Sequence, residues 1–203
     1  MSKQFTRYGI LFVISAPSGA GKTTLCAALR QSPDFIYSVS CTTRAPRAGE
    51  IAGEDYHFIS EQEFLARIDA GEFLEYAEVH GDYYGTLRKP LLANLQNGVD
   101  VLIDIDTQGA AAIRNFGDAF IRQALTDVFI MPPDLDELRR RLTKRGTETP
   151  AEIELRLVNA AREMELWRDY RYTIISKSVE EDLMKFRHIM GAERYLTRRL
   201  ILS

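Results

Sequence analysis

The sequence has little cysteine and little histidine: its 203 residues include two cysteines and three histidines. Cys26 and Cys41 do not have the spacing of metal ligands, and two cysteines do not make a disulfide framework. The histidines are scattered, so we expect them to be structural or solvated. These absences count against a disulfide-stabilised secreted scaffold and against a Cys/His metal centre, and they fit a reducing compartment.

Long apolar runs and a strong net charge are also lacking. No segment approaches the roughly 18 apolar residues of a membrane span. The first apolar run, Ile10–Ile14, is shorter than the core of a secretory signal, which needs about 7–15 residues, so we interpret it as a buried strand. The net charge of −3 offers no global surface for nucleic acid or an anionic membrane. We therefore expect a cytoplasmic protein with small-molecule partners; its oligomeric state stays open.

What the sequence does contain is a set of five short apolar segments that are typical of buried strands. Stretches with helical periodicity separate most of them. This alternation predicts an α/β fold with a parallel five-stranded sheet covered by helices. The predicted strands are Ile10–Ser15, Ile36–Ser40, Val101–Ile105, Asp127–Met131 and Tyr172–Ile175.

Helices and a second region complete the predicted organisation. Start signals or periodicity predict helices over Lys22–Arg30, from Pro133-Asp134 onward, from Pro150 onward and from Val179 to Met190. Residues 41–98 are instead rich in aromatic and charged side chains, with short half-polar strands around one helix, Glu61–Ala70. This pattern predicts a small mixed α/β sheet inserted beside the core.

A glycine-rich motif follows the first predicted strand. Residues 16–23 read Ala-Pro-Ser-Gly-Ala-Gly-Lys-Thr, the P-loop pattern with alanine in place of the first glycine. Glycines let the backbone approach phosphate closely, and the N–H groups at a helix start favour an anion. Lys22 can reach the β- and γ-phosphates, and Thr23 can place its hydroxyl on Mg²⁺. The motif predicts a nucleoside triphosphate site but does not separate a kinase from a GTPase or an ATPase. The predicted contacts are Ala16, Pro17, Ser18, Gly19, Ala20, Gly21, Lys22, Thr23 and Thr24.

An acidic segment ends the third predicted strand. Residues 101–106 read Val-Leu-Ile-Asp-Ile-Asp, so Asp104 and Asp106 share a face at strand spacing. A carboxylate here can hold Mg²⁺ through water or accept a proton from a ligand; the alternative is an acid that caps the next turn. Because the P-loop precedes this segment in the expected order, we predict that Thr23 and Asp106 hold Mg²⁺, directly or through water.

Two arginines three positions apart indicate a phosphate acceptor. Arg44 and Arg47, stiffened by Pro46, can form a fork for one phosphate because the planar guanidinium donates in pairs. Tyr56 and Tyr84 could add hydroxyl donors. Two loop arginines alone are more often solvated than bound to a ligand.

The complete set of motifs resembles the guanylate kinase family. They follow in order as Ser-x-Thr-Thr-Arg-x-Pro-Arg-x-Gly-Glu from Ser40, Asp-Tyr-His-Phe from Asp55, Phe-Leu-Glu from Phe73, Tyr-Tyr-Gly-Thr from Tyr83 and Asp-Ile-Asp-x-Gln-Gly from Asp104. The resemblance implies one domain, residues 1–203, with a three-layer P-loop NTPase core that binds ATP (1–40, 99–138 and 160–203). It also implies a GMP-binding insert (41–98) and a helical lid (139–159).

The resemblance also implies individual roles. Residues matching those that hold the GMP phosphate are Arg44, Arg47, Tyr56 and Tyr84. Residues matching those that bind guanine are Ser40, Glu75, Thr86 and Asp104. Residues matching the catalytic and lid positions are Lys22, Arg141, Arg145 and Arg156. The neighbouring Arg139, Arg140 and Lys144 are expected on the surface.

The chemistry of guanine fits these residue types. Guanine presents N1–H and N2–H₂ donors beside the O6 acceptor, so an ionised Glu75 can accept both donors while Ser40 and Thr86 donate to O6. Adenine would face the carboxylate with the wrong polarity, and unpaired buried groups discriminate strongly. Without the family pattern, Glu75 could equally be an exposed acid on an edge strand.

The implied reaction is Mg²⁺-dependent transfer of the γ-phosphoryl group of ATP to GMP, and to dGMP, in purine nucleotide metabolism. A kinase for another monophosphate, such as AMP, and a phosphopeptide-binding module of related fold are the alternatives. A regulatory GTPase would need an Asn-Lys-x-Asp element, which the sequence lacks. The family usually has Val-Asn-Asp-Asp after its last core strand, whereas this chain reads Ile175-Ser176-Lys177-Ser178, so no adenine contact is assigned there.

Overall fold

The centre of the molecule is a five-stranded parallel sheet, which confirms the predicted α/β fold. The computed structural model describes residues 5–79, 81–146 and 149–202. The strands lie in the order β10-β9-β2-β8-β3. Their bounds are Leu11–Ser15 for β2, Ile36–Tyr37 for β3, Val101–Asp104 for β8, Leu125–Met131 for β9 and Tyr172–Ile175 for β10.

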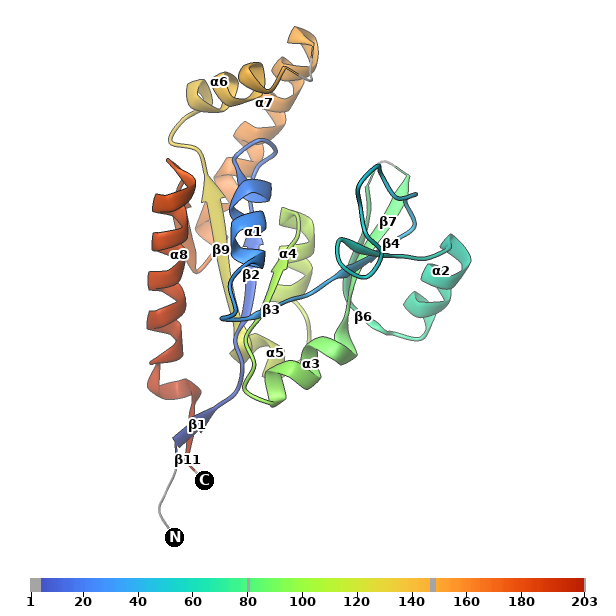
Figure 1. The fold of residues 1–203 in the computed structure, drawn as a ribbon, viewed down its shortest axis with the longest axis vertical. Helices are drawn as coiled ribbons and strands as arrows, with labels where there is room; N and C mark the ends of the chain where they lie inside the picture. The colour runs from blue at the N-terminus through green and yellow to red at the C-terminus, as the bar shows by residue number, and fades with distance from the viewer. Residues whose placement is uncertain (1–4, 80, 147–148, 203) are drawn as a thin grey trace.

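Helices cover both faces of this sheet and make three layers (Figure 1). Successive residues of β2 point to opposite faces, so Phe12 and Ile14 belong to one apolar cluster and Leu11 and Val13 to the other. The first cluster receives α1 (Lys22–Arg30) and α8 (Val179–Arg194). The second receives α3 (Arg88–Gln96), α4 (Thr107–Arg114) and α5 (Ala119–Ala124). Helix α3 thus packs on the core, although its residues fall in the range 41–98.

A four-stranded mixed sheet stands beside the core (Figure 1). Its order is β5-β4-β7-β6, with bounds Tyr56–Phe58, Ser40–Thr42, Asp82–Leu87 and Phe73–Val79. Helix α2 (Glu61–Asp69) begins after Ser60, whose hydroxyl accepts a hydrogen bond from the N–H of Glu63 at 3.1 Å. Phe64 of this helix stacks on Phe73 of β6 with ring centroids 4.4 Å apart. We call this sheet and α2 the insert.

The predicted strand Ile36–Ser40 is wrong as a single element. Ile36 and Tyr37 pair with the core strand β8, whereas Ser40 pairs with Tyr56 in the insert. The chain therefore leaves one sheet and enters another within three residues. The apolar pattern could not show this, because both partners lie far along the sequence.

Helices α6 (Leu135–Arg145) and α7 (Pro150–Met164) project beyond the carboxyl edge of the core sheet (Figure 1). They pack on each other through Leu138, Leu142, Ile153, Leu157 and Ala160. The start of α7 is a capping box: Thr149 donates its N–H to Glu152 at 2.7 Å, and its hydroxyl accepts from the Glu152 N–H at 3.4 Å. Pro150 supplies the first helical residue, as its sequence position predicted.

The two ends of the described chain form a ribbon that the sequence did not predict. Strands β1 (Phe5–Arg7) and β11 (Leu200–Leu202) pair antiparallel at the end of the molecule opposite α6 and α7 (Figure 1). Within residues 5–79, 81–146 and 149–202, none of the helices combines the length and apolar character that crossing a bilayer requires.

Candidate active site

The P-loop lies between β2 and α1 at the carboxyl edge of the core sheet. Gly19 and Gly21 adopt φ values of 86° and 104°, which favour glycine because a side chain there would be strained. Gly21 caps α1 without a side-chain hydrogen bond, so the first residues of the helix keep backbone N–H groups that no side chain of the cap satisfies. This is the geometry of an anion site at a helix N-terminus.

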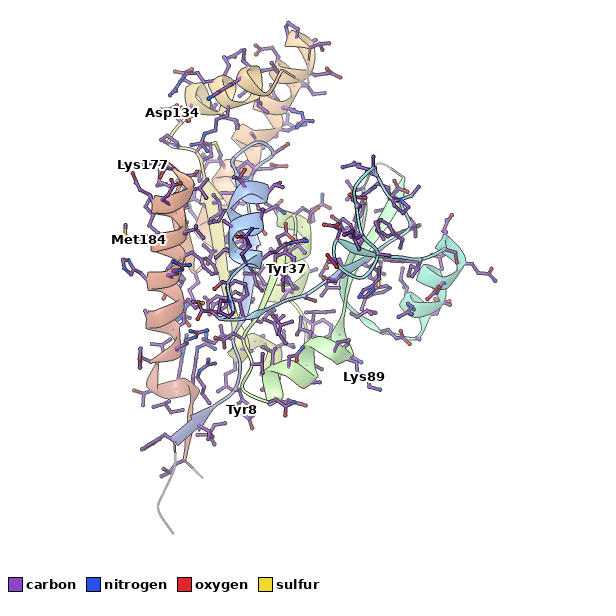
Figure 2. All side chains as sticks on the ribbon, in the orientation of Figure 1. Tyr8, Tyr37, Lys89, Asp134, Lys177 and Met184 are labelled. Carbon is purple, nitrogen blue, oxygen red and sulfur yellow. The ribbon has the colours of Figure 1, made fainter. Side chains whose placement is uncertain are left out.

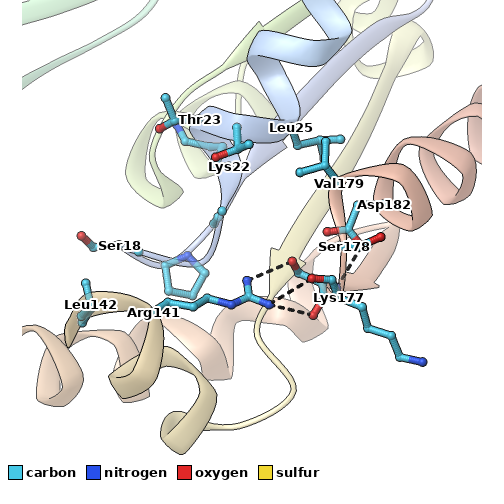
Figure 3. A pocket seen from close by; sticks show the side chains of 16 residues that line it. Ser18, Lys22, Thr23, Leu25, Arg141, Leu142, Lys177, Ser178, Val179 and Asp182 are labelled. Carbon is cyan, nitrogen blue, oxygen red and sulfur yellow. Dashed lines mark hydrogen bonds between the residues drawn. The ribbon is translucent and has the colours of Figure 1, made fainter. Parts of the chain in front are cut away.

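A pocket of about 650 Å³ opens in front of this loop (Figure 3). Eight of the nine predicted triphosphate contacts line it; Ala20 instead uses its carbonyl to accept a hydrogen bond from Arg141 at 2.9 Å. We call it the P-loop pocket. The eight are Ala16, Pro17, Ser18, Gly19, Gly21, Lys22, Thr23 and Thr24.

The far wall of the P-loop pocket comes from the segment after β10. Ser176, Lys177, Ser178, Val179 and Asp182 line it, and none of them was predicted. Arg141 of α6 donates to the Ser176 hydroxyl at 3.1 Å and to the Ser176 carbonyl at 3.2 Å (Figure 3). Their position after the last core strand could have predicted them, because ligands of parallel α/β sheets bind where the strands end at the carboxyl edge.

The other predicted lid arginines differ in placement. Arg156 of α7 donates to the Ser18 hydroxyl of the P-loop at 3.0 Å. The side chain of Arg145 lies outside the part of the chain that the structure describes. Arg139, Arg140 and Lys144 are exposed, as predicted. Glu163, also on α7 and not predicted, accepts a hydrogen bond from the Ser18 N–H at 3.2 Å.

A second pocket of about 210 Å³ lies between the core and the insert. We call it the acceptor pocket. Five of the eight residues predicted to bind GMP line it, namely Ser40, Tyr56, Glu75, Tyr84 and Asp104. Lys22 and Asp106 reach it from the core. Lys22 therefore lines both pockets, and its ammonium donates to the carbonyl of Ile105 at 3.1 Å.

Glu75 lines the acceptor pocket and is buried, with 7% of its surface exposed. Burial raises its pKa to about 7, because desolvation disfavours the charged carboxylate; the hydrogen bond from Thr86 acts in the opposite direction. The Thr86 hydroxyl donates to Glu75 Oε1 at 2.6 Å. In the ligand-free molecule that proton is engaged with Glu75, and the expectation that Thr86 donates to O6 stays a prediction. Ser40 is the predicted hydroxyl that lines the pocket itself.

The two arginines of the predicted fork are not equivalent. Arg44 is held by Glu50, with N–O distances of 2.7 and 2.9 Å, and its guanidinium lies 5.6 Å from the centre of the Tyr56 ring. The rings of Tyr56 and Tyr84 contact each other edge to face, with their centroids 5.9 Å apart. Arg47 is exposed, and neither arginine is among the residues lining the acceptor pocket. The Glu50 carboxylate organises this loop, since it also accepts the N–H of Arg47 at 2.7 Å.

Asp104 and Asp106 both line the acceptor pocket but occupy different positions in the fold. Asp104 ends β8, accepts a hydrogen bond from Tyr37 through Oδ1 and lies 3.8 Å from the Lys22 ammonium through Oδ2. Asp106 caps α4, accepting the N–H of Gly109 at 2.7 Å. Asp106 thus caps the next turn through Oδ1, as the alternative predicts, and its role in holding Mg²⁺ stays a prediction.

The arrangement defines a class of protein. A P-loop follows the first core strand, carboxylates end a neighbouring strand, and the P-loop lysine faces a second pocket built by an inserted sheet. These features are those of a P-loop kinase that brings a triphosphate and a small acceptor together.

Comparison with known proteins identifies the family within this class. Residues 8–193 match the family described as guanylate kinase. The chain is 46% identical over 189 residues to a guanylate kinase of Maricaulis maris, covering 93% of this chain and 85% of that protein. It is 42% identical over 196 residues to a guanylate kinase of Clostridium perfringens strain SM101, covering 95% and 87%.

Solved structures agree with these relatives. A crystal structure of guanylate kinase from Anaplasma phagocytophilum superposes with a TM-score of 0.77 at 36% identity, covering 97% of this chain and 92% of that one. A shikimate kinase from Bacteroides thetaiotaomicron, at 16% identity and a TM-score of 0.50, is similar in fold alone. The chain belongs to the guanylate kinase family.

Proposed function

We propose that this chain transfers the γ-phosphoryl group of ATP to GMP and forms ADP and GDP. The observation that carries the proposal is the position of Lys22, which lines both the P-loop pocket and the acceptor pocket. A cation there can neutralise charge on a phosphoryl group as it passes from one pocket to the other. Relatives named guanylate kinase support the same reaction.

The acceptor pocket supplies the base specificity. Buried Glu75, once ionised, accepts the N1–H and N2–H₂ donors of guanine, and the hydrogen bond from Thr86 holds its carboxylate in place. Ser40 and Asp104 complete the polar lining around the base. Adenine lacks the N1–H donor, so its binding would leave buried Glu75 unpaired, which carries a large penalty.

The acceptor phosphate binds at the open end of the pocket. Tyr56 and Tyr84 lie there in contact, with the Arg44 guanidinium against the Tyr56 ring. Arg47, exposed on the same loop, moves onto the phosphate when GMP binds. The second pKa of a phosphate monoester is about 6, so GMP is already a nucleophile at neutral pH and no protein base is needed.

The lid arginines act on the donor side. Arg141 and Arg156 already contact the P-loop through the Ala20 carbonyl and the Ser18 hydroxyl. Together with Arg145 they turn to the ATP phosphates when α6 and α7 close. Closure also excludes water, which would otherwise accept the phosphoryl group.

The residues present fit the Mg²⁺ that such a reaction uses. Thr23 offers an exposed hydroxyl at the P-loop pocket, and Asp106 offers Oδ2, the carboxylate oxygen not used in capping α4. Mg²⁺ prefers such oxygen ligands and completes its shell with phosphates and water. When bound, it would neutralise charge on the transferred phosphoryl group. The proposal also places the protein in the cytoplasm, where its free thiols Cys26 and Cys41 stay reduced.

A coupled assay of ADP release tests the proposal. With GMP as acceptor, ADP release should be saturable and Mg²⁺-dependent. With AMP, kcat/KM should be lower by about 10⁴ or more, because Glu75 is left unpaired. Equal rates with GMP and AMP would identify a different monophosphate kinase. ADP release without any acceptor would identify an ATPase, and phosphopeptide binding without ADP release would identify a binding module.

A further inference from the structure

Asp104 is held by a tyrosine that the predicted site does not include. Tyr37, the last residue of β3, lies where the chain leaves the core for the insert (Figure 2). Its hydroxyl donates to Asp104 Oδ1. The other carboxylate oxygen, Oδ2, lies 3.8 Å from the Lys22 ammonium, which instead donates to the Ile105 carbonyl at 3.1 Å. The Asp104 carboxylate thus lies between two partners, and within the described part of the chain its hydrogen bond comes from the tyrosine.

The ion pair between Lys22 and Asp104 is long, with 3.8 Å between the ammonium and Oδ2. Side-chain exposures of 24% for Lys22 and 29% for Asp104 mean that a shorter contact would be only partly screened. Without the hydroxyl, a small rotation of Asp104 would bring the two charges together. The carboxylate would then turn away from the acceptor pocket, and the ammonium would be neutralised before phosphate arrives.

The tyrosine is itself held from the insert. The Arg30 guanidinium of α1 lies 4.0 Å from the centre of the Tyr37 ring, and its NH1 is 3.3 Å from Asp55 Oδ1. Asp55 immediately precedes Tyr56 of the acceptor pocket. A cation over the ring fixes its plane and therefore the direction of the hydroxyl. A chain of contacts consequently runs from Asp55, in the loop before β5, through Arg30 and Tyr37 to Asp104.

We propose that Tyr37 is a positioning residue for guanosine monophosphate binding, which acts by fixing the Asp104 carboxylate in the acceptor pocket and out of hydrogen-bonding distance of Lys22. The inference rests on the proposed function and adds a residue that touches neither substrate. Arg30 holds the Tyr37 ring and links it to Asp55 in the loop before β5. The role requires the hydroxyl alone, since the ring could pack equally well as phenylalanine.

Calorimetric titration of GMP into the full chain tests this role. Tyr37→Phe should raise the GMP Kd about tenfold, as expected for loss of a hydrogen bond to a charged group. The Kd for ATP should rise by less than the Kd for GMP, because Asp104 lines the acceptor pocket and reaches the P-loop pocket only through Lys22. Tyr195→Phe is the matched control, since Tyr195 is 86% exposed and should bind GMP as the wild type does.

A double-mutant cycle separates positioning from a general structural effect. In an Asp104→Ala background, Tyr37→Phe should produce no further change in GMP Kd, because the hydroxyl has no carboxylate left to hold. An equal tenfold effect in both backgrounds, or a GMP Kd within twofold of wild type for Tyr37→Phe, would overturn the inference. If the wild type itself bound no GMP, the proposed function would fail first, and the inference with it.

Discussion

The raised pKa of Glu75 predicts that GMP binding weakens as the pH falls. In the proposed function, guanine binds the ionised carboxylate of Glu75, and burial raises the pKa of this group to about 7 in the ligand-free protein. Protonation of Glu75 therefore competes with GMP binding below that pH, and GMP reaches its full affinity only above it. For one competing proton, the apparent Kd rises by a factor of about 1.1 at pH 8, about 2 at pH 7 and about 11 at pH 6.

Calorimetry at pH 8, 7 and 6 measures this dependence directly. GMP itself gains a proton near pH 6, so the wild type must be compared with Glu75→Gln, which shares the titration of the phosphate but not that of the carboxyl group. The ratio of the two Kd values isolates Glu75, and only the wild type should show the roughly tenfold change from pH 8 to pH 6. ATP binding should show no such difference between the two proteins.

Proton release gives a second, independent measurement. At pH 7 about half of the ligand-free molecules carry the proton on Glu75, so GMP binding should release about half a proton. Titrations in two buffers of different ionisation enthalpy measure this number. The reasoning is refuted if wild type and Glu75→Gln show the same pH dependence and the same proton release.

Three further predictions follow from the same geometry. Lys22→Ala should lower kcat by about 10²–10³ while the GMP Kd measured by calorimetry stays within threefold, because the lysine neutralises the transferred group and does not bind the base; an unchanged kcat would contradict its role. Gly109→Ala should raise the KM for GMP about tenfold, since its Cβ would lie 3.0 Å from Glu75 Oε2, whereas Gly191→Ala, with no neighbour within 4 Å, is the silent control. In urea unfolding, Glu75→Gln should stabilise the ligand-free protein by up to about 3 kcal/mol at pH 8 and by less than about 0.5 kcal/mol at pH 4.5, because an ionised Glu75 is costlier folded than unfolded.

The elements that the sequence predicts best are those set by local patterns. Helix α1 has the predicted bounds, Lys22–Arg30, because the glycine-rich turn before it and Pro33 just beyond it are local signals. The P-loop pocket follows from the same segment. The helix α7 start is equally local, since Thr149 and Glu152 form its capping box and Pro150 is its first residue, without any distant partner.

Features that depend on distant partners could not be predicted. Strand β1 pairs with β11 from the other end of the chain, and no local signal distinguishes Phe5–Arg7 from a loop. The family pattern predicts a ligand role for the Thr86 hydroxyl. Its contact with Glu75, eleven residues away, depends on how β6 and β7 pair across a register shift, so no local pattern predicts it. Tyr37 was assigned to an ordinary core strand, because nothing in its neighbours indicates a carboxylate partner at position 104.

The meeting of the two pockets has a topological cause. Strands β2 and β8 are parallel neighbours, so their carboxyl ends emerge at the same edge of the sheet, one leading into the P-loop and the other into the acidic segment. Their register places Ile14 beside Asp104. A slip of one residue would turn buried side chains to the opposite face, and burial of both faces of β2 resists this. Lys22 therefore reaches the Ile105 carbonyl and the edge of the acceptor pocket because two apolar strands are fixed in register, and the apolar core determines where the phosphoryl group can be transferred.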